Sequence, residues 1–140
     1  MFSHVCVGCS DLERAAAFYD SLLAPLGLRR RVVLADGGPA AACWVGESVG
    51  LPRFYVYRPF NEAAASAGNG SMVAFLASST AAVQEAHAAG LAAGGCNEGA
   101  PGPRPRYGEG YYGAYLRDLD HNKIHLVFRG DLSASPGPRP

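Results

Sequence analysis

YLRDLDHNKIHLVF, residues 115–128, predicts two strands joined by a polar turn. The DLDHN segment at its centre predicts a tight reversal, because Asp and Asn side chains bond to nearby backbone groups and tolerate left-handed conformations. Beyond the turn, the residues alternate as on a strand with two faces. One face carries Ile124, Leu126 and Phe128, and the other carries Lys123, His125 and Val127. The first face suits a core, whereas an imidazole in the middle of the second fits either a lined cavity or a half-exposed surface strand.

The composition is that of an ordinary globular protein. The 140 residues suffice for one domain, or for two small modules that share a core. Basic and acidic residues balance at 12 each, so no nucleic-acid or anionic membrane partner is predicted. The first residues, MFSHVCVG, lack the basic segment of a signal peptide, and no apolar run is long enough to cross a bilayer. We therefore expect a cytoplasmic protein.

Four cysteines are present, and Cys6 and Cys9 form a C-x-x-C motif of the kind found in zinc and redox sites. The second pair that a zinc ribbon needs is absent, and the motif ends a predicted strand rather than opening a helix, where a thiolate would be stabilised. Reduced, buried thiols are the expected state.

Apolar periodicity and turn residues divide the chain into short elements. A capping box formed by Ser10 and Glu13 predicts the start of the first helix. The expected helices are residues 11–23 and 79–90. The expected strands are residues 2–8, 28–34, 41–45, 53–57, 71–76, 91–96 and 111–116, followed by the strand after the turn. A linker at 62–70, a long Gly- and Pro-rich loop at 97–110 and a disordered tail at 131–140 complete the prediction.

The element order repeats itself along the chain. Asp11 opens the first helix seven residues after His4, and Ser79 opens the second seven residues after Met72. Two copies of strand-helix-strand-strand-strand account for this pattern, with module 1 at about 1–60 and module 2 at about 70–130. We expect an α+β fold in which each helix covers one face of a sheet and the other face forms a cup.

Three segments resemble the vicinal oxygen chelate superfamily, which includes glyoxalase I, bleomycin-resistance proteins and extradiol dioxygenases. They are FSHVCVGCSDLERAAAFYDSLLAPLGL, GNGSMVAFLAS and GYYGAYLRDLDHNKIHLVF. The likeness extends to about Arg129 and is strongest to small glyoxalase-like proteins of bacteria. It implies curved mixed sheets that form a cup, often completed by a second subunit, so a homodimer is expected.

The resemblance also implies positions for metal ligands on the first and last strands of each module. It places His4 at one of them and His125 at another, where the family usually has Glu. Imidazoles suit Zn, Ni, Fe or Mn. For His4 the residues leave two alternatives, metal ligation or a cavity histidine bonded to a neighbouring hydroxyl, and His125 follows His4. A divalent metal and no metal at all both remain open.

The other two ligand positions depart from the family pattern. Met72 stands where His is usual, and Tyr55 and Tyr57 stand where a carboxylate or His is usual. Two imidazoles fall short of the three protein ligands of a catalytic zinc site. Completing the set would require one of three further residues: Cys6, Glu98 or Glu109.

Several large side chains are candidates for lining the ligand-binding cup. They are Trp44, Tyr55, Tyr57, Met72, Arg106, Tyr107 and Tyr112. For Trp44 and the tyrosines at 55, 57 and 112, packing between the modules is the alternative.

Two functions therefore stand side by side. One is a glyoxalase-like lyase, isomerase or dioxygenase that acts on a small oxygen-rich substrate through a metal. The other is a metal-free protein of the bleomycin-resistance type that sequesters a small aromatic or drug-like molecule. The fold alone cannot choose between them.

Overall fold

The computed structural model describes residues 1–48 and 50–132, which form two consecutive βαβββ modules. The first comprises β1 (His4–Gly8), α1 (Leu12–Leu23), η1 (Ala24–Leu26), β2 (Leu28–Arg31), β3 (Ala41–Gly46) and β4 (Arg53–Tyr57). The second comprises β5 (Val73–Leu76), α2 (Thr80–Ala92), β6 (Cys96–Pro103), η2 (Pro105–Tyr107), β7 (Tyr111–Arg117), β8 (Lys123–Arg129) and η3 (Gly130–Leu132).

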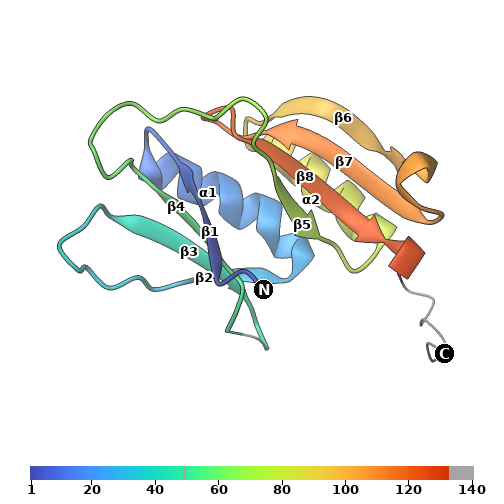
Figure 1. The fold of residues 1–140 in the computed structure, drawn as a ribbon, viewed down its shortest axis with the longest axis horizontal. Coiled ribbons are helices and arrows are strands. Elements are labelled where there is room, and N and C mark those ends of the chain that lie inside the picture. The colour runs from blue at the N-terminus through green and yellow to red at the C-terminus, as the bar shows by residue number, and fades with distance from the viewer. Residues whose placement is uncertain (49, 133–140) are drawn as a thin grey trace.

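Each module contributes a four-stranded mixed sheet (Figure 1). Sheet A has the order β1-β4-β3-β2, and sheet B has the matching order β5-β8-β7-β6. In both, the first strand of the module runs parallel to the last, while the other neighbours are antiparallel. The predicted α+β fold of two βαβββ modules is therefore confirmed.

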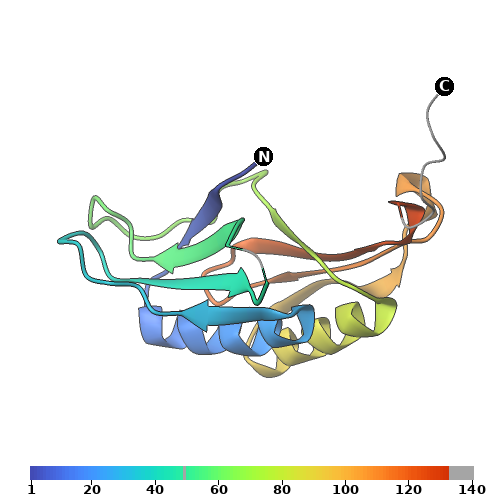
Figure 2. The same ribbon diagram turned by 90° about the horizontal axis from the view of Figure 1, so that it is seen from below.

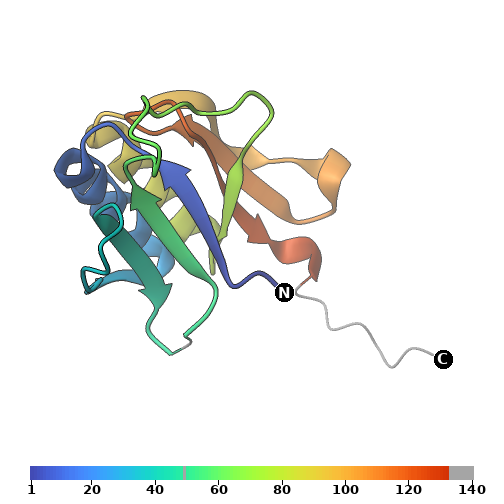
Figure 3. The ribbon, with the colours of Figure 1, turned by 60° about the vertical axis from the view of Figure 1, so that its left-hand side comes forward.

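The two helices lie side by side and cover the same face of both sheets (Figure 2). Sheet A presents β1, β4 and β3 next to one another on the opposite side from the helices (Figure 3). The modules meet inside the helix-covered layer, where the rings of Phe54 and Phe75 pack edge to face with centroids 5.0 Å apart. One shared core thus leaves the other face of each sheet open.

The predicted DLDHN turn also holds the two modules together. Tyr19 of α1 donates its hydroxyl proton to the buried carboxylate of Asp118 over 2.5 Å, and the Asn122 side chain donates to the carbonyl of Gly8 over 3.0 Å. Asp118 in turn accepts from the backbone N–H groups of Asp120 and Asn122. His121 adopts a left-handed φ of 67°, as its predicted place in the turn requires. The hairpin of module 2 is thereby fastened to the β1–α1 corner of module 1.

The start of α1 differs from the prediction. Asp11, and not Ser10, is the N-cap, because its carboxylate accepts from the backbone N–H of Arg14 at 3.1 Å. The backbone N–H of Ser10 instead donates to Asp120 over 2.9 Å, which makes it part of the contact between modules.

The region after α2 was predicted wrongly. Helix α2 continues to Ala92, and most of the supposed loop at 97–110 belongs to β6 and η2. β6 lies at the edge of sheet B and pairs with β7 through a register that shifts twice. An edge strand tolerates Pro and Gly and here buries little, so it carries no apolar alternation by which it could be recognised.

Two further predictions concern the C-terminal tail and the absence of a membrane-spanning segment. Of the predicted disordered tail, Asp131 and Leu132 belong to η3, and residues 133–140 lie outside the described residues. Among the residues that the structure describes, no helix has the length and apolar character needed to cross a bilayer.

Candidate ligand-binding site

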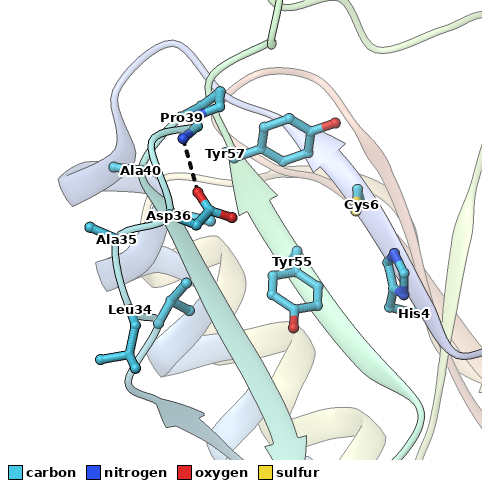
Figure 4. A pocket seen from close by; sticks show the side chains of 12 residues that line it. His4, Cys6, Leu34, Ala35, Asp36, Pro39, Ala40, Tyr55 and Tyr57 are labelled. Atoms are coloured by element: carbon cyan, nitrogen blue, oxygen red, sulfur yellow. Dashed lines mark hydrogen bonds between the residues drawn. The ribbon is translucent and has the colours of Figure 1, made fainter.

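The open face of sheet A carries four of the side chains discussed above. His4 and Cys6 are exposed and alternate with half-buried positions on β1, and Tyr55 and Tyr57 alternate with buried positions on the neighbouring β4. The rings of His4 and Tyr55 pack edge to face with centroids 5.6 Å apart. Because β1 and β4 pair in parallel register, this alternation places imidazole, thiol and two phenols on one surface (Figure 4).

The β2–β3 loop, residues 32–40, forms the other wall and turns this surface into a cavity of about 410 Å³ (Figure 4). Val33, Leu34 and Pro39 contribute apolar lining, and Asp36 contributes a carboxylate. One oxygen of Asp36 accepts from the backbone N–H of Gly38 at 2.9 Å, which fixes the loop locally. A cavity of this size with apolar walls and a few polar groups suits a small organic molecule.

His4 and Cys6 are exposed in this cavity. The Nδ1 atom of His4 lies 3.0 Å from the hydroxyl of Ser3, which agrees with the alternative of a cavity histidine bonded to a neighbouring hydroxyl. Partial burial raises the pKa of the Cys6 thiol, with a further contribution from Cys43. The thiol therefore stays protonated near neutral pH, a form that neither attacks electrophiles nor binds metals well.

His125 occupies the matching face of sheet B, but its surroundings are closed. Its ring stacks on Tyr115, with centroids 4.1 Å apart, and lies nearly parallel to the ring of Tyr111, with centroids 5.9 Å apart. Nδ1 lies 2.9 Å from the carbonyl oxygen of Ala114, and Nε2 lies 2.7 Å from the hydroxyl of Tyr111. A carbonyl only accepts, so Nδ1 carries the proton and, in the neutral ring, Nε2 accepts from Tyr111.

The surroundings of His125 also favour the neutral form of its imidazole. Burial lowers the pKa of His125, and the positive charges of Arg104 and Lys123 lower it further, against a raising contribution from the bond to Ala114. Gly113 makes room for this ring, since a Cβ atom at that position would come within 2.5 Å of its Cε1 atom. Both nitrogens of the imidazole and its face against Tyr115 are thus already engaged.

These placements do not fit a metal site within one chain. His4 and His125 lie on different sheets, and a metal at His125 would have to displace a hydrogen bond. Glu98 is engaged by Arg117, whose guanidinium bonds its carboxylate at 2.8 Å and lowers its pKa. In residues 1–48 and 50–132, no three His, Cys, Asp or Glu side chains gather as metal ligands. The two predicted imidazole ligands are therefore not brought together.

The predicted cup residues are divided between different parts of the molecule. Tyr55 and Tyr57 line the cavity, as predicted, although their binding of a ligand stays a prediction. Met72 is 46% exposed just before β5 and lies outside the cavity lining. Arg106 and Tyr107 lie in η2 and contact each other, with the guanidinium 4.9 Å from the ring centroid.

For Trp44 and Tyr112 the structure favours packing, the stated alternative to lining the cup. Trp44 is completely buried against α1, where its indole N–H donates to Asp20 over 3.0 Å. Tyr112 packs against the core and its hydroxyl accepts from Gln84 of α2 over 2.8 Å. Both alternate with cup-facing neighbours on their strands, so an error of one position in the face assignment reverses their environment.

Sequence analysis did not identify Asp36 as part of the cavity lining. It also did not identify Tyr111 and Tyr115 as neighbours of His125. The alternation of GYYGAYL would have placed Tyr111 and Tyr115 on the face of His125. No comparable signal marks Asp36, which belongs to a loop whose path depends on the whole fold.

Together, the fold and the cavity define a protein of paired βαβββ modules with a ligand-sized site on the open face of a mixed sheet. A glyoxalase/bleomycin resistance protein from Albidiferax ferrireducens matches it with a TM-score of 0.76 and 39% identity, over 92% of this chain and 98% of that one. The chain therefore belongs to the glyoxalase/bleomycin resistance protein family, and the resemblance to the vicinal oxygen chelate superfamily is confirmed.

More distant structures share the fold. A lactoylglutathione lyase from Agrobacterium tumefaciens matches with a TM-score of 0.62 and 21% identity, over 96% of each chain. A glyoxalase/bleomycin resistance protein/dioxygenase family enzyme from Burkholderia phytofirmans matches with a TM-score of 0.67 and 16% identity, over 90% of this chain and 96% of that one. No protein-family model matches the sequence, and no curated protein does.

Proposed function

We propose that this chain binds a small aromatic molecule in the cavity of sheet A. Binding requires no metal, and the function is to sequester the molecule. The observation that carries this proposal is the cavity of about 410 Å³ between His4, Tyr55, Tyr57 and the β2–β3 loop. Its phenol rings and apolar loop side chains offer flat and apolar contact, which is how proteins hold drug-sized aromatic molecules.

The engaged state of His125 supports the metal-free form of the proposal. In a catalytic metal site about three protein ligands must present free donor atoms, and this imidazole presents none without a rearrangement. The second candidate is the metal-dependent lyase-type enzyme. It is favoured by the exposed imidazole of His4 in the cavity, to which a second subunit would have to add the remaining ligands.

We further propose that the protein is a cytoplasmic homodimer. Large apolar side chains on or beside the open faces support association, among them Phe2, Met72 and Leu76, which are 78%, 46% and 66% exposed. A second copy that covers these side chains would close the open cups of both sheets.

Metal analysis and ligand titration separate the two functions. Protein purified without a histidine tag is analysed for transition metals and titrated with neopentylbenzene, a neutral aromatic probe, by NMR. The proposal predicts a metal content well below one equivalent and saturable binding that weakens at least about tenfold in Tyr57→Ala, because one ring of the lining is lost. About one equivalent of bound metal would contradict it and favour the enzyme.

A further inference from the structure

We propose that the cavity of sheet A selects an organic cation: a quaternary or protonated amine attached to an aromatic body. Asp36 supplies the opposite charge, and the rings of Tyr55 and Tyr57 supply π faces. This inference rests on the proposed binding function and names the class of ligand for the same site.

The charge of the cavity is the first support. Among the described residues that line it, Asp36 is the only Asp, Glu, Lys or Arg. The carboxylate is directed into the space in front of Tyr55 and Tyr57 (Figure 4). One of its oxygens is oriented by the N–H of Gly38. The ion pairs found in the described part of the chain do not include this carboxylate. A cation that enters the cavity therefore meets an oriented negative charge.

The tyrosine rings are the second support, and sheet B provides the comparison. There the protein covers its aromatic faces with its own cations: Lys123 lies 5.3 Å from the centroid of Tyr115, and Arg129 lies 5.1 Å from that of Tyr111. In the described residues, the rings of Tyr55 and Tyr57 carry no such cation. Aromatic faces next to a carboxylate are the arrangement by which proteins recognise quaternary ammonium groups.

Arg53 and His4 contact Tyr55, and both contacts are compatible with a bound cation. The guanidinium of Arg53 lies 3.5 Å from the hydroxyl of Tyr55, and Arg53 does not line the cavity. The imidazole of His4 packs edge to face against Tyr55 and so limits the positions that this ring can take.

The test uses two probes of nearly the same shape. Benzyltrimethylammonium and neopentylbenzene differ in one atom, a positively charged nitrogen in place of a carbon, so the ratio of their affinities isolates the effect of charge. Both are titrated into the full chain by NMR. We expect the ammonium to bind at least about tenfold more tightly, since cation–π and carboxylate contacts both favour it.

Variants of Asp36 then assign the selectivity. In Asp36→Asn the affinity ratio should fall to about threefold or less, whereas Asp36→Glu should keep most of it. Glu85→Gln, an exposed change of equal charge on α2, is the matched control and should leave the ratio as in the wild type. Thermal unfolding checks that every variant folds.

The outcomes distinguish this inference from the function on which it rests. Equal affinity of both probes for the wild type, or a ratio that survives Asp36→Asn, would overturn cation selection and leave aromatic binding intact. Failure of both probes to saturate the protein would overturn the binding function itself and, with it, the inference.

Discussion

At the scale of single residues, His125 is held on several sides at a position where the resemblance implied a metal ligand. The imidazole is 2% exposed, stacked on the ring of Tyr115 and bonded at both nitrogens. Its environment was hidden from sequence analysis, because the partners of a strand residue come from a neighbouring strand. Its orientation toward the open face, in contrast, followed from simple alternation.

The buried imidazole should make stability depend on pH. Burial lowers the pKa of His125 in the folded state, so the unfolded chain binds the proton first as the pH falls below about 6.5. The free energy of unfolding should then decrease, by at most about 1.4 kcal/mol per pH unit, until the folded state also binds the proton. Urea unfolding at about pH 7.5 and about pH 5.5 measures the effect.

Comparison with two variants assigns this dependence to the residue. His125→Gln should remove much of the difference between the two pH values, whereas His4→Gln, at an exposed histidine, should retain it. An unchanged pH dependence in His125→Gln would show that the loss of stability arises elsewhere.

Gly113 should be required by the same ring. In Gly113→Ala the new Cβ atom would meet His125 Cε1 at 2.5 Å and the backbone oxygen of Leu126 at 3.2 Å. We expect a loss of about 1–3 kcal/mol in unfolding free energy, the usual effect of overpacking a close contact. Gly50→Ala is the control, since a Cβ atom there has no heavy atom within 4 Å. Equal stability of the two variants would refute the steric role.

At the scale of elements, sequence analysis succeeded where one face is buried and failed where neither is. The alternation in β1 and β4 follows their burial, whereas β8 buries residues on both faces, and all three strands were placed within a few residues. β6 has no apolar face and is identified only through its pairing with β7. The cavity wall formed by the β2–β3 loop was missed for the same reason, since a loop position depends on distant contacts.

The DLDHN turn is an element whose shape was predicted and whose docking role was not. Tyr19→Phe removes the hydroxyl proton that Asp118 accepts in the buried interface. We expect a loss of about 1.5–3 kcal/mol in the free energy of unfolding, as for hydrogen bonds to charged groups. Tyr57→Phe, at the cavity, should change it by no more than about 0.5 kcal/mol. Equal effects of the two substitutions in urea unfolding would argue against the fastening role.

At the scale of the whole molecule, both sheets turn one face to the helices and leave the other open (Figure 2). The open face of sheet B ends in exposed Leu76, and β5 alternates there between exposed and more buried positions. Apolar side chains arranged in this way are typical of surfaces that associate.

We expect association through this face to be measurable. Sedimentation velocity should show a dimer for the wild type and a shift toward monomer for Leu76→Glu, because a charge in an apolar interface is costly. Leu91→Glu, an exposed position on α2, is the control and should remain dimeric. A wild-type monomer at all concentrations would exclude the proposed homodimer.

The central claim, metal-free binding of an aromatic molecule in sheet A, is tested most directly by mapping where a ligand binds. The measurement is a two-dimensional NMR titration of isotope-labelled, metal-free protein with neopentylbenzene. The account predicts saturable shifts concentrated in β1, β4 and residues 33–36 and 38–41, which supply the lining of the cavity. Shifts centred on His125 and the tyrosines of sheet B, or binding that appears only after a divalent metal is added, would contradict it.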